Sequence, residues 1–152
     1  MSIDPFFDFK AKIENKKLIY YFTANGALIT ELRIVDFINK LTEILESLEN
    51  DQIKQVYFIF NIDKLVIPSN FSFLKELGDC FKNKNKLLKE KLMFTIVINK
   101  SNIFHLFFSL FKQYYEPVKS LYLCKDINEM QVCLHDEDKR STFPNILSLI
   151  NV

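Results

Sequence analysis

The chain has two histidines, the side chains that most often move protons near neutral pH, and neither stands beside a suitable nucleophile. His135 directly precedes the acidic run 136–138, and a histidine next to a carboxylate is the pattern of a general base. No serine or cysteine occupies a strained Gly-x-Ser-x-Gly turn. We therefore expect His135 to be a solvated residue of the C-terminal tail, His105 to lie on the surface of a helix, and the protein not to be an enzyme.

The three cysteines, Cys80, Cys124 and Cys133, are odd in number and have no short paired spacing, which argues against a disulfide framework. Cys124 and Cys133, together with His135 and Asp136, offer groups that bind metals. The C-x2-4-C spacing of a compact zinc site is missing, however, and Cys124 falls in an apolar run typical of a buried strand. We expect core cysteines and no metal.

Only two glycines, Gly26 and Gly78, occur among the 152 residues, and they are far apart. Glycine-rich loops that bind phosphates need clustered glycines, so we expect no nucleotide cofactor and no other cofactor. The 20 basic and 19 acidic residues give a net charge of +1. A nucleic-acid-binding domain has a strongly basic surface, so we expect no nucleic acid partner.

One local cluster departs from this charge balance, and it consists of Lys82, Lys84, Lys86, Lys89 and Lys91. Lysines near a membrane surface attract anionic lipid headgroups, at about 1 kcal/mol per residue. A solvated helix end is the alternative, because lysines in a last turn also complement the helix dipole. If the cluster contacts an anionic surface, Lys82, Lys84 and Lys86 are the residues expected to do so.

Strands and helices alternate along the chain. The alternation of apolar residues from Phe7 to Ile13, the turn 14–17 and the run 18–23 predict a β-hairpin. Strands are then predicted at 55–62, 92–98 and 118–124, where apolar residues run with little alternation. Helices are predicted at 30–50 with Thr30 as N-cap, from 69 or 70 to 91 with a break near 83–85, at 103–115 and at 127–134.

This order predicts an α/β fold with an N-terminal hairpin and a mixed, mainly parallel sheet covered by helices. The length suits a single domain, which we place at 1–134, followed by an acidic and then apolar tail at 135–152. No signal peptide and no transmembrane segment are visible. We therefore expect a cytoplasmic location.

The helix predicted at 103–115 has aromatic or aliphatic side chains around almost its whole circumference. A helix that lies on a sheet needs one apolar face, so some of this surface is in excess. A partner chain, a lipid, the C-terminal tail or a wide core contact are the alternatives for covering it. The residues of a possible interface are Phe104, Phe107, Phe108, Phe111 and Tyr115.

The order of elements resembles the STAS domain, the fold of bacterial anti-sigma-factor antagonists and of the cytoplasmic ends of anion transporters. The exit Gly26-Ala27-Leu28 into the first helix and the run Val56–Ile67 resemble that family's hairpin exit and central strand. The run Phe94–Ile98 and the strand 120–124 with its short following helix 127–130 resemble the closing half. The resemblance spans about residues 7–134 and concerns the pattern of elements.

Signalling members of that family carry Asp-Ser-Ser/Thr-Gly after the central strand, with one hydroxyl phosphorylated. The corresponding stretch here is Pro68-Ser69-Asn70-Phe71-Ser72, which lacks the motif. A phosphate on Ser69 would still lie at a helix N-terminus, and the alternative for Ser69 is a simple N-cap. The loop and helix start predicted to bind a partner comprise Asp63, Lys64, Ser69, Asn70 and Ser72.

Two functions follow as expectations. The first is a non-enzymatic, STAS-like interaction or regulatory module that binds a partner protein or a second copy of itself. The second comes from a more distant resemblance to the CRAL-TRIO lipid-transfer core, which has a similar alternation of elements and an apolar cavity. This alternative binds a lipid or another apolar ligand and requires an internal cavity of roughly 300 Å³ or more.

Overall fold

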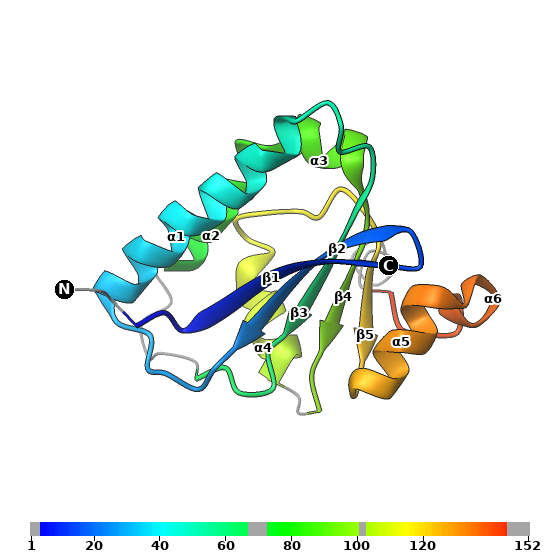
Figure 1. Ribbon diagram of the computed structural model, residues 1–152. Coiled ribbons are helices and arrows are strands. Elements are labelled where there is room, and N and C mark those ends of the chain that lie inside the picture. The colour runs from blue at the N-terminus through cyan, green and yellow to red at the C-terminus, as the bar shows by residue number, and fades with distance from the viewer. Residues whose placement is uncertain (1–3, 67–72, 101–102, 146–152) are drawn as a thin grey trace.

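The computed structural model describes residues 4–66, 73–100 and 103–145 (Figure 1). These residues contain one sheet with the strand order β1-β2-β3-β4-β5. The strands are β1 (Phe7–Glu14), β2 (Lys17–Ala24), β3 (Val56–Asn61), β4 (Leu92–Ile98) and β5 (Leu121–Cys124). The helices are α1 (Glu31–Glu46), the 3-10 turn η1 (Ser47–Glu49), α2 (Phe73–Lys82), α3 (Asn85–Lys91), α4 (Ile103–Phe111), α5 (Ile127–His135) and α6 (Glu137–Arg140).

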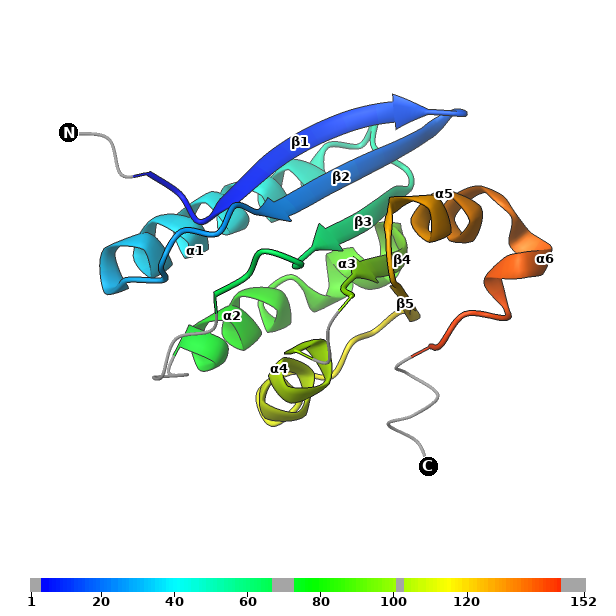
Figure 2. The same ribbon diagram turned by 90° about the horizontal axis from the view of Figure 1, so that it is seen from below.

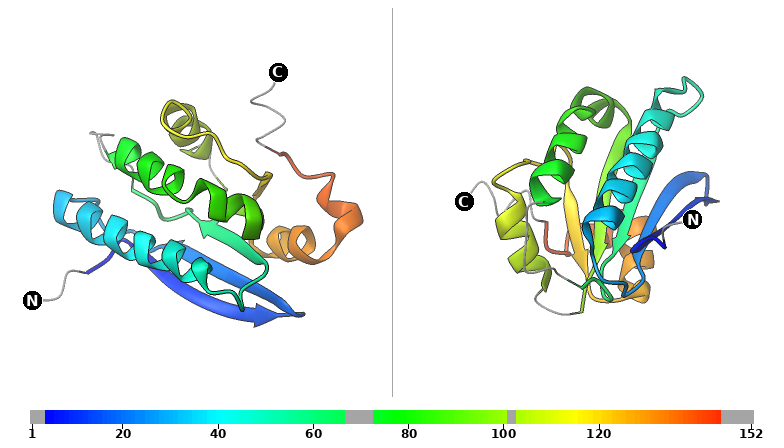
Figure 3. Two further views of the ribbon diagram at one scale, coloured as in Figure 1. Left: turned by 90° about the horizontal axis from the view of Figure 1, so that it is seen from above. Right: turned by 90° about the vertical axis from the view of Figure 1, so that its left-hand side faces the viewer.

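The predicted α/β fold is confirmed. Strand β1 pairs antiparallel with β2, and every later neighbour in the sheet is parallel. Helices α1 to α4 lie on one face of the sheet, and α5 lies on the other (Figures 2 and 3). Helices α1 to α4 connect successive parallel strands from β2 to β5. Right-handed crossovers that continue in one direction across a sheet place their helices on the same face.

A two-residue turn closes the hairpin. Asn15 (φ 49°) and Lys16 (φ 67°) both have left-handed backbone conformations, the geometry whose twist matches that of the flanking strands. On β1, Phe9 contacts the rings of Tyr20 and Phe22, each at 5.2 Å between centroids. Beyond Phe9 the strand is largely exposed, and Ile13 is 77% exposed, because β1 is an edge strand that α1 covers only in part.

The apolar run of β3 is buried on both sides. Tyr57 and Ile59 face α5 and belong to one hydrophobic cluster with its residues Met130, Cys133 and Leu134. Val56 and Phe58 face the other helices and pack with residues of α1, α2 and α3, among them Leu41, Leu45, Cys80 and Leu88. Coverage of both faces explains why this strand shows almost no polar alternation.

Helix α1 begins where the sequence predicts. The Thr30 hydroxyl accepts a hydrogen bond from the Arg33 amide at 3.3 Å and so caps the first turn. Leu41 and Leu45 are completely buried towards the end of the helix. The predicted break near 83–85 is also present, since it separates α2 from α3.

Four elements differ from the prediction by more than one residue. Helix α1 ends at Glu46, where a helix to residue 50 was predicted, and β5 begins at Leu121 instead of residue 118. Helix α4 ends at Phe111, four residues early, because Tyr114 donates its amide to Phe111 in a tighter turn at 2.9 Å. The short helix α6 was not predicted, and it belongs to the segment interpreted as a tail. That segment packs on the domain: the Leu123 amide of β5 donates to the carbonyl of Pro144 at 3.0 Å, and Tyr122 forms a bridge with Asn145.

Candidate functional site

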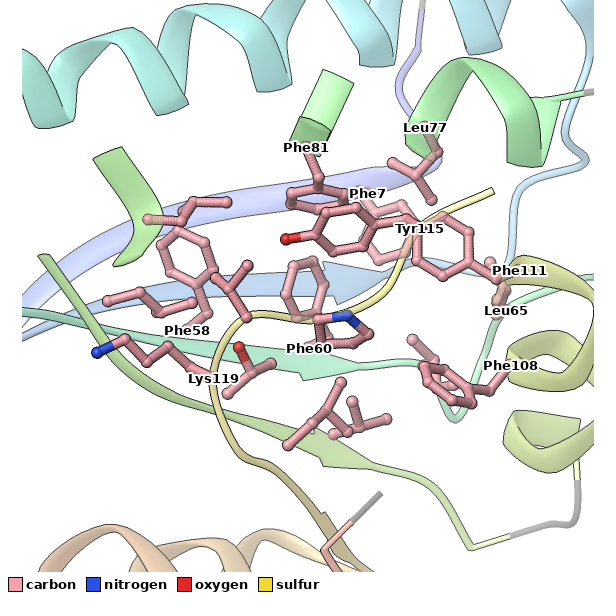
Figure 4. Close-up of a pocket in the computed structure, with 18 of the residues that line it drawn as sticks. Phe7, Phe58, Phe60, Leu65, Leu77, Phe81, Phe108, Phe111, Tyr115 and Lys119 are labelled. Atoms are coloured by element: carbon pink, nitrogen blue, oxygen red, sulfur yellow. The ribbon is translucent and has the colours of Figure 1, made fainter. Parts of the chain in front are cut away.

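A partly open, apolar cavity of about 130 Å³ lies between the sheet and helices α2, α3 and α4 (Figure 4). Its lining is dominated by aromatic rings that come from strands, helices and the chain's N-terminal end. The aromatic lining residues are Phe6, Phe7, Phe37, Phe58, Phe60, Phe73, Phe81, Phe108, Phe111 and Tyr115. In the described part of the chain, no helix is both long enough and apolar enough to cross a membrane.

One close contact between helices sets the shape of the cavity. A Cβ added at Gly78 on α2 would lie 2.8 Å from Cβ of Tyr114, which follows α4, so only glycine permits this approach. The contact brings the turn after α4 against α2. As a result Phe111 and Tyr115 reach the cavity, where the ring of Tyr115 stacks on that of Phe81 with centroids 5.4 Å apart.

The strands supply the opposite wall. Phe60 of β3 stacks almost parallel on Phe22 of β2, with an interplanar angle of 8° and centroids 4.5 Å apart. Val97 and Thr95 of β4 lie beside it on the same face of the sheet. Phe60, Val97 and Thr95 line the cavity on the side opposite the helices.

Three polar side chains interrupt the apolar lining. The Tyr115 hydroxyl donates to Oδ1 of Asn85 at 3.1 Å, and burial raises the pKa of Tyr115 to about 12, so it stays a neutral phenol. Thr95 is buried. Lys119 is the one charged residue of the lining in the described part of the chain, and Figure 4 shows it at the Phe58 end of the cavity, away from Phe108.

The lining contains few titratable side chains. It includes no histidine, cysteine, aspartate or glutamate among the residues that the structure describes. Tyr115 and Lys119 are the titratable side chains of the lining among those residues. Elsewhere in the described ranges, no group of three or more His, Cys, Asp and Glu side chains is arranged to hold a metal ion.

The loop predicted to bind a partner is described only in part. Asp63 and Lys64 are exposed at the carboxyl end of β3. Oδ1 of Asp63 accepts a hydrogen bond from the Lys100 amide at 2.7 Å, so this carboxylate fastens the loop after β3 to the loop after β4. Ser69, Asn70 and Ser72 lie outside the described residues, and the proposed role of this loop stays a prediction.

Three residues of the predicted interface helix face inward. Phe108, Phe111 and Tyr115 are each only 7% exposed and line the cavity, so they offer no outer surface to a partner. The physical reason is the close approach of α2 and α4 at Gly78, which gives the aromatic helix a wide core contact. The side chains of Phe104 and Phe107 lie outside the described part of the chain.

The lysine cluster divides into two groups. Lys84 forms an ion pair with Glu49 at 3.2 Å, and Lys91 donates to the carbonyls of Leu48 and Asn50. These two lysines therefore tie α3 to the end of the first helical segment. Lys82 and Lys86 are exposed and remain candidates for contact with an anionic surface.

The histidines lie apart from the cavity. His105 is exposed, as expected. His135 is half-buried: its Nδ1 lies 3.4 Å from Nδ2 of Asn15 and its Nε2 lies 3.9 Å from Glu14. The expectation of a solvated tail residue was therefore wrong for His135, because the end of α5 packs against the turn of the hairpin.

The residues that line the cavity could not be recognised as one set from the sequence. Phe6 and Phe7 precede or begin the first strand, whereas Leu121 comes from the last one. The alternation of side chains along a strand could have indicated part of this lining. Phe58, Phe60 and Phe22 all point to the face of the sheet that the crossover helices cover. Comparison of the chain with family models, curated proteins and solved structures finds no match.

Proposed function

We propose that this chain is a cytoplasmic, non-enzymatic binding module that takes a small, mainly apolar ligand into the cavity. The observation that carries the proposal is an almost wholly apolar, partly open space of about 130 Å³ lined by core side chains. An engineered apolar cavity of about 150 Å³ stays dry and binds benzene, so a space of this size and lining suits a ring or a short acyl chain. The free, buried state of all three cysteines agrees with a reducing compartment.

The size of the cavity limits the ligand. Drug-sized and lipid-sized ligands occupy pockets of about 300–1,000 Å³. The space here is smaller than the lipid-binding alternative requires. The proposed ligand is therefore much smaller than a membrane lipid.

Lys119 gives the ligand a direction. It lies at one end of an otherwise uncharged lining, and no ion pair or hydrogen bond of its ammonium group is found among the described residues. A short monocarboxylate would place its tail between the aromatic rings and its carboxylate at this end. An ammonium–carboxylate contact of this kind is a charge-assisted hydrogen bond.

The experiment uses the full chain, with benzene and hexanoate as probes and the midpoint of thermal unfolding as the first readout. Both probes are expected to raise the midpoint, because a ligand that binds only the folded state stabilises it. Val97→Phe fills the cavity and should abolish both effects, and Leu77→Phe is a second filling variant if the first does not fold. Met93→Phe adds an exposed ring on the same strand and should change neither effect.

Lys119→Met separates the two probes. It should weaken hexanoate binding about tenfold and leave benzene binding unchanged, as measured by titration calorimetry. If benzene and hexanoate leave the midpoint of the wild-type chain unchanged at millimolar concentrations, the proposed ligand-binding function is wrong.

A second candidate function is protein interaction, and one surface favours it. Leu32 and Val35, which lie about one turn apart at the start of α1, are more than half exposed, and so is Leu28 in the loop before the helix. Such a row of apolar side chains is typical of an interaction surface. Light scattering of the purified chain tests for self-association, and a dimer that Leu32→Glu dissociates would support this function. If the chain is a monomer and neither benzene nor hexanoate stabilises it, the remaining candidate is a different protein that binds this surface.

A further inference from the structure

Two of the three cysteines lie together under α5, on the face of the sheet opposite the cavity. Cys124 is the last residue of β5, and Cys133 lies in the last turns of α5. Both are almost completely buried, at 2% and 0% exposed, and they belong to one hydrophobic cluster. The third cysteine, Cys80 of α2, lies in a different cluster on the other face.

The two thiols interact, and their surroundings make them unequal. A hydrogen bond with Cys124 lowers the pKa of Cys133, and the nearby guanidinium of Arg140 lowers it further against the effect of burial. The same hydrogen bond raises the pKa of Cys124, and burial and the carboxylates of Glu129 and Asp126 act in the same direction. The positive charge of Arg140 beside Cys133 and the carboxylates beside Cys124 favour a thiolate at Cys133 over one at Cys124.

Hydrogen bonds and a ring contact hold the Arg140 side chain beside Cys133. Its Nε donates to the carbonyl of Cys133 at 2.7 Å, and its Nη2 donates to the carbonyl of Leu134 at 3.0 Å. Its guanidinium also lies over the ring of Phe94, 4.4 Å from the centroid. The positive charge thus stays beside Cys133 while it also caps the C-terminal end of α5.

We propose that Cys124 and Cys133 form a reversible oxidation site that cross-links β5 to α5 in response to a hydroperoxide. The thiolate of Cys133 attacks one peroxide oxygen, breaks the O–O bond and becomes a sulfenic acid, and the other oxygen leaves as water after taking up a proton. The thiol of Cys124 then attacks the sulfenic sulfur and expels a second water. Two thiols and one hydrogen peroxide thus give one disulfide and two waters, and a reducing dithiol returns both thiols.

The burial of the pair determines how the reaction proceeds. Peroxide reaches the sulfurs only when α5 opens locally from the sheet, so oxidation is slower than for an exposed thiol. The disulfide then fixes α5 to the end of β5. Oxidation therefore restricts the local opening of α5 from the sheet. The cavity on the opposite face is not part of this change.

The experiment treats the folded full chain with hydrogen peroxide and follows the intact mass and a non-reducing peptide map. We expect the loss of two hydrogens, a disulfide between Cys124 and Cys133, and recovery of the original mass with dithiothreitol. Cys80 is the internal control, because its pKa is raised by burial and its sulfur lies 3.5 Å from the Thr42 hydroxyl instead of another thiol. It should remain reduced.

Variants identify the order of the steps. Cys80→Ser should leave the mass loss unchanged, and Cys133→Ser should abolish it. Cys124→Ser should leave a sulfenic acid at Cys133 that dimedone captures. The proposal is overturned if the folded wild-type chain keeps its mass under peroxide, if the cross-link includes Cys80, or if the disulfide forms only in urea. The wild-type peptide map decides these outcomes even where a variant fails to fold.

Discussion

At the scale of single residues, Gly78 shows how an absent side chain positions the cavity. Glycine inside a helix is about 1 kcal/mol less favourable than alanine, so Gly78→Ala would stabilise an isolated α2. In the folded protein the new methyl group would lie 2.8 Å from Cβ and 3.1 Å from the carbonyl oxygen of Tyr114. We expect the clash to prevail and the free energy of unfolding to fall by about 1–3 kcal/mol.

Urea unfolding followed by circular dichroism measures this change. Lys75→Ala is the matched control, because it places an alanine at an exposed position of the same helix and should change stability by less than about 0.5 kcal/mol. A Gly78→Ala variant as stable as the wild type would mean that α2 and α4 can separate without cost. The cavity would then be wider in solution than the contact at Gly78 allows.

Tyr115 links the cavity to pH. Its pKa is raised to about 12, whereas an unfolded tyrosine titrates near 10. Between these values the folded chain binds a proton that the unfolded chain has lost, so stability falls as pH rises from about 10 to 12. Tyr115→Phe removes this contribution, and it also removes the hydrogen bond to Asn85, which is worth about 1 kcal/mol.

We therefore expect Tyr115→Phe to be less stable than the wild type at pH 8 and to lose much of that disadvantage at pH 11. Urea unfolding at both values gives the two differences. Tyr21→Phe is the comparison variant. Burial and the neighbouring Glu14 also raise the pKa of Tyr21 to about 12, but Tyr21 does not line the cavity. An equal difference between wild type and Tyr115→Phe at both pH values would contradict the assignment.

At the scale of elements, the hairpin turn contains a backbone conformation that its sequence does not favour. Lys16 has a φ of 67°, which costs a non-glycine residue about 1–2 kcal/mol, and Asn-Gly is the preferred pair in this type of turn. Lys16→Gly should raise the free energy of unfolding by about 0.5 kcal/mol, after the entropic cost of glycine is subtracted. Lys16→Ala keeps the strained conformation and should give no gain, and equal urea midpoints for the two variants would show that the turn is not strained.

Much of this element structure could be predicted, because it depends on local patterns. The two-residue hairpin, the Thr30 cap and the break between α2 and α3 each result from a few adjacent residues. The early end of α4 could not be predicted in this way. It depends on the contact of Tyr114 with Gly78, which lies on another helix. The aromatic excess of α4 was visible, but only the tertiary structure places Phe108 and Phe111 in the core.

The candidate site shows the same limit more clearly. A cavity is the space left when side chains from distant segments fail to fill a volume, so no single pattern in the sequence encodes it. Its walls include Phe6 from the start of the chain and Leu121 from the last strand. The expectation that the chain is not an enzyme stays a prediction, and an expectation of this kind does not locate a binding site.

At the scale of the whole molecule, the two edges of the sheet differ. The outer edge of β1 is the free edge among the described residues, whereas β5 is covered on its outer side by residues beyond 134. The Leu121 amide donates to Oδ1 of Asn145 at 3.3 Å, and the Leu123 amide donates to the Pro144 carbonyl. Residues 135–145 are therefore structural parts of the domain, although the sequence placed them in a tail.

This difference predicts the effect of shortening the chain. A chain that ends at residue 134 loses the hydrogen bonds at the edge of β5, the two bonds that Arg140 makes at the end of α5 and its contact with Phe94. Each hydrogen bond is worth about 1 kcal/mol, so this chain should be at least about 3 kcal/mol less stable than one that ends at residue 145. Urea unfolding of the two shortened chains makes the comparison. Equal midpoints would show that the fold is complete at 134, in which case the packing of Arg140 and Asn145 adds nothing to its stability.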